Sequence, residues 1–139
     1  MFLTENDYIV ASADALKILQ QSTEEKREIA EKMAIEEIAS YLRSRYDTDK
    51  IFSSTGDERS SVIVMYACDV TLYHLNSWLA MKMGHDIRKE RYERALKWLD
   101  GVQAGRIIPA LPTVTGDDGK EDINNSFKWG SEKKQGYNW

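Results

Sequence analysis

The chain has few of the residues and segments on which several protein classes depend. Its one cysteine, Cys68, cannot form an internal disulfide, which is typical of a protein from a reducing compartment. No apolar run approaches the roughly 20 residues that cross a bilayer. The first residues turn acidic with no basic segment before them, unlike a secretory signal. These absences predict a small, soluble, intracellular protein.

Residue patterns for catalysis and for metal or phosphate binding are also missing. The two histidines, His74 and His85, do not form the ligand spacing of a zinc site with Cys68 or Asp69. Cys68 and His74 are six residues apart on one predicted helix, so their side chains point in different directions and a nucleophile–base pair is not expected. No glycine-rich phosphate-binding or dinucleotide-binding motif occurs. We therefore expect a protein that is not an enzyme, with no catalytic, cofactor-binding or metal-binding residues.

Positive charge is in the minority. The chain has 19 lysine and arginine residues against 23 aspartate and glutamate residues, for a formal net charge of −4 at pH 7. Because electrostatic nucleic-acid binders carry an excess of positive charge, a dedicated one is not expected. A basic cluster on the last predicted helix keeps a nucleic-acid-binding module open as an alternative: Arg88, Lys89, Arg91, Arg94 and Lys97. Glu90 and Glu93 lie between these residues and favour a salt-bridged or intersubunit face.

Apolar residues are unevenly distributed along the chain. Hydrophobic residues make up 42% of the whole, but only six of the 27 residues from Thr113 to Trp139 are apolar. The first 112 residues are correspondingly richer in apolar residues and can form one hydrophobic core. We therefore predict a helical domain over residues 1–112 and an extended tail over residues 113–139 that becomes ordered when a partner binds.

Apolar spacing and capping residues predict that this domain consists of helices. Two short helices are expected first, at Thr4–Asp7 and Ser12–Leu19. Three longer ones are expected over about residues 23–45, 60–83 and 86–101 or 86–105. The middle one of these three is apolar on nearly all sides, which is typical of a helix surrounded by others. The sequence thus predicts an all-α fold, a small antiparallel helical bundle.

The same spacing predicts the buried faces and the links of the long helices. On the first long helix the predicted core positions are Ile29, Met33, Ile38 and Leu42, supported by Ala30, Ala34 and Tyr41. Glu31 is predicted to face solvent. On the last helix the predicted core stripe is Ile87, Arg91, Ala95, Trp98 and Val102. Residues 47–57 are expected to form a polar loop in which Ile51-Phe52 contacts the core or forms a very short strand, and residues 106–112 an extended stretch.

Two charged residues lie among apolar ones. Asp69 interrupts the most apolar helix, and Arg45 ends the first long helix beside Tyr46. A buried carboxylate needs a partner, and a guanidinium can bind it through two hydrogen bonds. We predict a structural ion pair between Asp69 and one of three arginines, Arg45, Arg88 or Arg91, that holds two helices in register.

Aromatic residues are concentrated near the end of the polar tail. Four of them, which include two of the chain's four tryptophans, are Phe127, Trp129, Tyr137 and Trp139. Segments without a core usually lack aromatic residues, whereas protein interfaces are enriched in them. We predict that these four residues bind a partner protein. The alternative is that the tail folds back over its own domain.

Several landmarks of the sequence occur in the order found in a known family. They are Ala34, the run Ile38–Tyr46, a polar loop, Asp69 with Leu72-Tyr73 and Leu75, the run Arg91–Leu99, and Ala104-Gly105-Arg106 before a proline-rich exit. This order resembles that of the phage head–tail connector proteins, also called adaptor or head-completion proteins, including their Mu-like gp36 group. The resemblance covers residues 4–112.

The resemblance implies a structural protein of the virion with no catalytic activity. It implies a homo-oligomeric ring, a dodecamer, at the portal vertex in the neck of the virion, between the portal protein and a tail or stopper protein. The ring would extend the channel through which DNA passes without specific binding, and no membrane is involved. The family's core positions correspond here to Tyr41, Leu42, Tyr46, Asp69, Tyr73, Tyr92, Ala95 and Leu99. We interpret them, with Arg45 and Arg91, as residues of the fold and of subunit packing.

A second function stays open beside the connector. A small bacterial helical adaptor or regulator could also bind a partner protein through an aromatic C-terminal tail. Oligomerisation separates the two functions, because ring formation, alone or on a portal, favours the connector.

Overall fold

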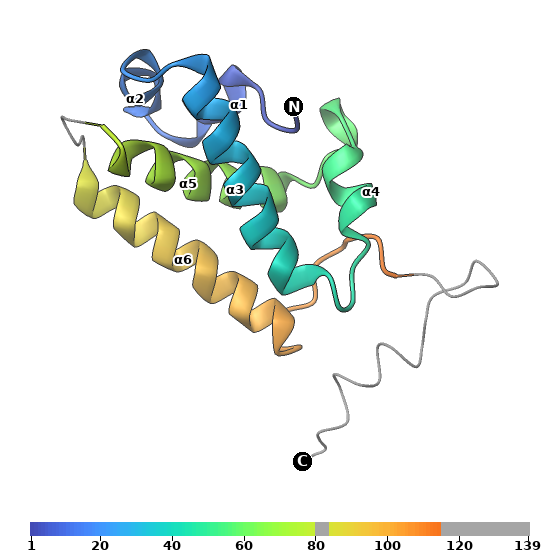
Figure 1. Ribbon diagram of the computed structural model, residues 1–139. Coiled ribbons are helices and arrows are strands. Elements are labelled where there is room, and N and C mark those ends of the chain that lie inside the picture. Colours follow the sequence, from blue (N-terminus) through green and yellow to red (C-terminus); the bar gives the residue numbers. More distant parts are fainter. Residues whose placement is uncertain (80–83, 115–139) are drawn as a thin grey trace.

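Six α-helices make up most of the described chain (Figure 1). The computed structural model describes residues 1–79 and 84–114. The helices are α1 (Glu5–Ala11), α2 (Ala15–Gln20), α3 (Glu24–Leu42), α4 (Thr48–Ser53), α5 (Ser61–Ser77) and α6 (His85–Gln103), with a 3₁₀ turn at Gly56–Glu58. Over the described residues, β-type pairing is limited to one isolated antiparallel bridge between Tyr46 and Thr113. The predicted all-α bundle is confirmed, with one short helix more than expected.

Helix α5 lies at the centre of the bundle. Helices α1, α2, α3 and α6 all pack against it, and Figure 1 shows α3 crossing it with α1 and α2 grouped near the start of α3. Six successive residues of α5, from 67 to 72, are fully buried. A helix with no solvent-facing side over this length needs neighbours on several faces, as its apolar composition predicted.

Three of the helices begin where the sequence predicted, and the side chain of the residue before each one caps its first turn. The hydroxyl of Thr4 accepts from the N–H of Asp7, and the Asp7 carboxylate accepts from the N–H of Thr4 at 2.7 Å. Thr23 and Ser60 each accept in the same way from the N–H three residues on, at the starts of α3 and α5. These bonds satisfy N–H groups that have no partner inside the helix.

The turn between α5 and α6 differs from the prediction. Helix α5 ends at Ser77 rather than near Met83, and α6 begins at His85. The residue before α6 is Gly84, whose φ of 56° lies in the left-handed region. Asp86, where the predicted helix started, lies in the first turn of α6.

The segment after α3 contains a helix, α4, where a loop or a very short strand was predicted. The carboxylate of Asp47 accepts from the backbone N–H three residues on, at 3.1 Å, and so starts this helix. Ile51 is buried, and Phe52 packs edge-on against Phe2 with the ring centroids 5.1 Å apart. The predicted core contact is therefore present, but it is made by a helix, because Asp47 starts a helix as readily as it starts a turn.

Helix α3 buries only part of the predicted core face. Ile29 and Met33 are exposed, whereas Glu31, predicted to face solvent, is only 2% exposed. The supporting positions Ala30 and Ala34 are fully buried, and the predicted core positions Ile38 and Leu42 are buried as well. Small side chains let neighbouring helices approach closely, so close packing outweighs side-chain hydrophobicity here.

The start of α6 also reverses a prediction, because Ile87 is exposed and Arg88 is buried. The Arg88 guanidinium donates to the hydroxyl of Ser12 at 2.8 Å and lies 3.6 Å from the carboxylate of Asp14. These partners replace only part of the water that a charged group needs, because Nε and Nη1 of Arg88 have no hydrogen-bond partner among the described residues. They come from the segment between α1 and α2, far away in the sequence.

After α6 the chain has no regular secondary structure over residues 106–112, turns at Pro109–Leu111, and returns to the end of α3. The N–H of Asp47 donates to the carbonyl of Pro112 at 2.8 Å, and the N–H of Val114 donates to the carbonyl of Arg45 at 2.9 Å. These bonds hold the chain against the helical body as far as Val114.

Candidate functional site

Asp69 is a buried acid of α5 whose partners come from α6. Its carboxylate lies 3.5 Å from Arg91 Nη1 and 3.4 Å from Arg94 Nη2. Burial raises the pKa of Asp69, and the charges of Arg91, Arg94 and Arg88 lower it by less. Of the three predicted partners, Arg91 makes the contact, and Arg94, which was not predicted, makes a second one.

Arg45 and Tyr46 lie at the end of α3 and attach the C-terminal stretch. The ion pairs of Asp69 are with α6, so the alternative pairing with Arg45 does not occur. Tyr46 is buried, and its backbone forms the bridge with Thr113. These two residues hold the chain that follows α6, rather than joining α3 to α5.

Tyr73 and Tyr92 belong to a cluster that joins α3, α5 and α6. Their rings are stacked with centroids 4.1 Å apart. The Tyr92 hydroxyl donates to Glu37 Oε2 at 2.6 Å, and His74 Nε2 lies 2.9 Å from Glu37 Oε1. Burial and the hydrogen bond to Glu37 raise the pKa of Tyr92, so its phenol stays protonated. The sequence did not predict the role of Glu37, because its partners are 37 and 55 residues away and no local pattern marks them.

A second partly buried ion pair holds α1 to the segment before α5. Arg59 donates to both oxygens of the Asp7 carboxylate, at 2.6 and 3.1 Å, and to the carbonyl of Phe2 at 2.9 Å. Burial alone would raise the pKa of Asp7, but hydrogen bonds from Arg59 and Thr4 outweigh it, and the pKa is lowered overall. This pair was also not predicted, because its residues lie 52 positions apart.

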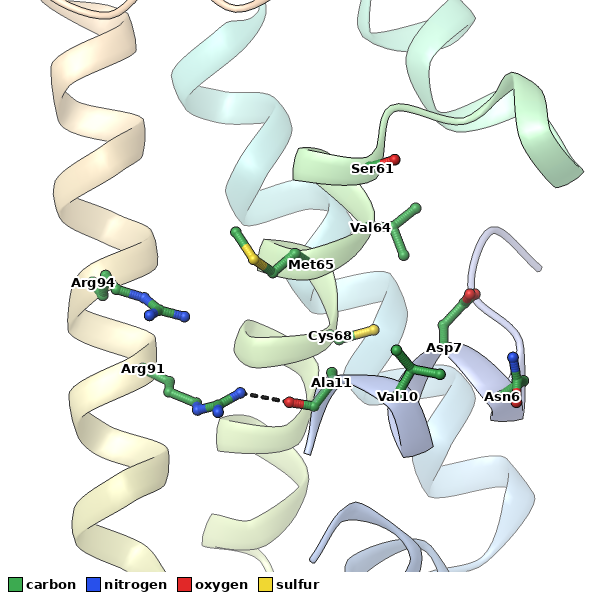
Figure 2. A pocket seen from close by; sticks show the side chains of 10 residues that line it. All are labelled: Asn6, Asp7, Val10, Ala11, Ser61, Val64, Met65, Cys68, Arg91 and Arg94. Carbon is green, nitrogen blue, oxygen red and sulfur yellow. Dashed lines mark hydrogen bonds between the residues drawn. The ribbon is translucent and has the colours of Figure 1, made fainter. Parts of the chain in front are cut away.

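A groove of about 590 Å³ lies between α1, α5 and α6 (Figure 2). Its apolar lining includes Val10 from α1 and Val64 and Met65 from α5. Arg91 and Arg94 line its α6 side. The groove therefore combines an apolar surface with a positively charged wall, and it includes the arginines of the Asp69 ion pairs.

Cys68 lines the groove, and burial raises the pKa of its thiol, which stays protonated. Within residues 1–79 and 84–114, no three histidine, cysteine, aspartate or glutamate side chains are grouped so that they could hold a metal ion. No helix in the same part of the chain is long and apolar enough to cross a membrane.

A protein-family model described as "Bacteriophage Mu, Gp36" matches residues 4–125 of the chain. The chain belongs to this phage family. No significant match was found among curated proteins or among solved structures. Membership of the Gp36 family indicates a phage structural or morphogenesis protein.

The Gp36 match extends further along the chain than the resemblance predicted from the sequence. It includes the groove and all the ion pairs described above, and it runs past Pro112 to residue 125. The four aromatic residues predicted to bind a partner lie beyond the match and outside the described residues: Phe127, Trp129, Tyr137 and Trp139. Their role in this Gp36-family protein stays a prediction.

Proposed function

We propose that the protein is a head–tail connector, or adaptor, of the virion neck. Its copies form a homo-oligomeric ring, a dodecamer, at the portal vertex between the portal protein and a tail or stopper protein. The ring extends the channel through which DNA passes. The observation that carries this proposal is the Gp36 family match over residues 4–125, which includes the whole described helical body from α1 onward.

The role that we propose is structural and involves no catalysis. The polar side chains inside the body bind one another across helices, as Asp69 does with Arg91 and as Glu37 does with Tyr92. Groups paired in this way stabilise the arrangement of helices and are not free to act on a substrate. They support a rigid body that is repeated around a ring.

The charge of the chain supports a channel that does not hold DNA. A net charge of −4 on each copy, repeated around a ring, repels the phosphate backbone. In the basic cluster of α6, Arg88 is buried, and Arg91 and Arg94 lie beside Asp69. Because these arginines are buried or contact a carboxylate of the same protein, they support an intersubunit or structural face and weigh against a nucleic-acid-binding module.

Exposed apolar side chains support subunit packing. Single exposed apolar residues are normal on a protein surface, but Ile29 and Met33 are one helical turn apart on α3, so they share a face. Subunit interfaces of permanent oligomers are more apolar than other surfaces. This face of α3 is a suitable contact between copies.

The C-terminal segment extends this role to neighbouring proteins of the neck. We propose that the aromatic residues of the last part of the chain, Tyr137 and Trp139 among them, dock into the portal protein or an adjacent connector protein. Aromatic side chains contribute much of the binding energy of interfaces.

Electron microscopy and native mass spectrometry of the purified protein test the ring. We expect ring-shaped particles from the protein alone or from its mixture with the portal protein of the same phage. If the protein is monomeric by itself and does not bind the portal protein in the mixture, the connector is contradicted. That result favours the small bacterial adaptor or regulator.

A further inference from the structure

The groove between α1, α5 and α6 presents apolar surface to solvent in a concave part of the molecule. Val10 is 77% exposed, and Met65 is also exposed. Figure 2 shows Val10 and Val64 on the same side of α5, with α3 on the far side. Apolar side chains gathered in a groove are typical of a binding site for another chain.

The wall of the groove formed by α6 carries excess positive charge. The side chains of Arg91 and Arg94 are 34% and 55% exposed, and both lie beside one fully buried carboxylate, that of Asp69. Asp7, the other acid of the groove, is already bound by Arg59 through both carboxylate oxygens. One positive charge of the arginine pair is therefore left without a countercharge in the groove.

We propose that this groove binds residues 117–129 of a neighbouring copy of the chain, an inference that rests on the proposed ring. This segment has four acidic residues against two lysines: Asp117, Asp118, Glu121 and Asp122, with Lys120 and Lys128. Large apolar residues follow the acids, namely Ile123, Phe127 and Trp129. The acids complement the α6 wall, and the apolar residues complement Val10 and Met65.

The chemistry of the groove favours this peptide over nucleic acid. A phosphate backbone can use the two arginines but gains nothing from an apolar lining. An acidic and aromatic peptide uses both features of the groove, because its carboxylates bind guanidinium groups while its rings leave water.

The C-terminal stretch leaves the helical body at a point from which the segment can reach another copy. Val114 is bonded to Arg45, just after α3, and Pro112 lines a pocket together with Ser60, at the start of α5. The residues from 115 to 129 extend the chain by at most about 50 Å. We assign the segment to a neighbouring copy because the proposed ring brings such a copy against each subunit, and the cross-linking experiment distinguishes it from the same copy.

Photo-cross-linking of the full chain tests the contact. The variant Phe127→p-benzoylphenylalanine is prepared as a mixture of ¹⁵N-labelled and unlabelled copies, and cross-linked peptides are identified by mass spectrometry. We expect cross-links to peptides that contain Met65 or Val10, between labelled and unlabelled copies. Benzophenone reacts readily with the C–H bonds of methionine, so Met65 is a favourable acceptor.

A matched pair of surface substitutions tests the specificity of the contact. Val10→Asp places a negative charge in the groove, and we expect it to lower the cross-link yield about tenfold. Ile108→Asp is the control, because Ile108 is 79% exposed and does not line the groove. We expect this control to keep the yield of the parent protein.

The inference is overturned if cross-links are confined to single copies, if they form with other surfaces, or if the two aspartate variants lose yield equally. Native mass spectrometry of the same samples shows whether the ring forms, and so separates the proposed ring from the proposed groove contact. A ring without the groove cross-link overturns this inference alone, whereas a protein that stays monomeric even with its portal overturns the proposed function and the inference with it.

Discussion

Three buried or partly buried acids show how single residues balance burial against hydrogen bonding. Asp7 is bound by a guanidinium through both oxygens, and its pKa is lowered. Glu31 accepts from two backbone N–H groups and a tyrosine hydroxyl, all of them neutral, and its pKa is raised by burial. Asp69 lies beside two arginines at 3.4 and 3.5 Å, but burial raises its pKa. Asp7 differs from the other two because Arg59 donates two short hydrogen bonds to it, at 2.6 and 3.1 Å, and because its side chain keeps 13% of its surface exposed.

We expect Asp7→Asn to lower the free energy of unfolding by about 1–2 kcal/mol at neutral pH. The substitution weakens both the ion pair with Arg59 and the cap of α1. Because the folded pKa of Asp7 lies below its ordinary value of 3.8, this stabilisation is complete above that value and is lost as the pH falls through the folded pKa. Urea unfolding of both proteins from neutral to strongly acidic pH measures the difference.

The control for this variant is Asp100→Asn. Asp100 forms an ion pair with Arg106 at 3.5 Å in which both side chains are about two-thirds exposed. Such surface pairs contribute less than about 1 kcal/mol, so this variant should differ little from the parent. A difference for Asp7→Asn that persists unchanged at acidic pH would contradict the pKa direction.

The pH dependence of a second variant, Glu31→Gln, should have the opposite sign. Burial raises the pKa of Glu31 above its ordinary value of 4.5, against smaller effects of the hydrogen bonds from Leu3, Tyr8 and Phe2. The native state therefore binds this proton more tightly than the unfolded chain. We expect the stability of the parent relative to the variant to fall as the pH rises above 4.5 and to level off above the folded pKa.

Denaturant unfolding at a series of pH values checks this second dependence. The glutamine side chain of the variant carries no charge at any pH. A difference in unfolding free energy between parent and variant that does not change with pH therefore reflects only altered hydrogen bonding. A parent that gains stability over the variant as the pH rises would show that the hydrogen bonds outweigh burial at Glu31.

At the scale of elements, the start of α6 depends on one glycine. Gly84 has a φ of 56°, where an L-residue with a Cβ is strained by about 1–2 kcal/mol. A Cβ there would also lie 2.8 Å from Asp14 Oδ2, and Asp14 lies beside the buried Arg88. We expect Gly84→Ala to lower the free energy of unfolding by about 2 kcal/mol or more, measured by thermal or urea unfolding.

Gly56→Ala is the matched control for this element. Its φ of 58° is nearly the same, but a Cβ there would meet nothing within 4 Å. This variant should show the backbone strain alone, about 1–2 kcal/mol. Equal losses in the two variants would mean that the contact with Asp14 has no cost.

The elements also differ in how well the sequence predicted them. Thr23 and Ser60 start α3 and α5 as predicted, because a cap acts on N–H groups only three residues away. The buried face of α3 was predicted wrongly at Ile29 and Met33. Which face of a helix is buried depends on the shape of the neighbouring helix, and α5 accepts the alanine side of α3.

At the scale of the whole molecule, the end of the folded body can be located by two truncations. A chain that ends at Val114 keeps the backbone bond to Arg45, whereas one that ends at Pro112 loses it, together with the bridge made by Thr113. We expect the first to have the circular dichroism spectrum and melting temperature of the full chain. The second should be less stable by about 1 kcal/mol.

The truncation at Val114 also tests assembly. It removes the segment proposed to bind the neighbouring copy and the aromatic residues proposed to bind the portal. We expect a folded protein that no longer joins the ring or the portal in gel filtration and electron microscopy. Normal assembly without residues 115–139 would assign recognition to the helical body instead.

The sequence by itself determined the helical class, the starts of α1, α3 and α5, and the central position of α5. These features depend on apolar spacing and on side chains that bind the backbone a few residues away. It also indicated the phage family, through the order of landmarks such as Asp69, Tyr73 and Arg91.

Only the tertiary structure decided which charged groups are buried and what they bind. Glu31 with the N–H of Phe2, Arg88 with Ser12, and Asp69 with Arg94 join residues from 25 to 76 positions apart. The groove between α1, α5 and α6 likewise exists only when three distant segments pack together. No local pattern determines these contacts, because each depends on the shape and charge of elements that meet only after folding.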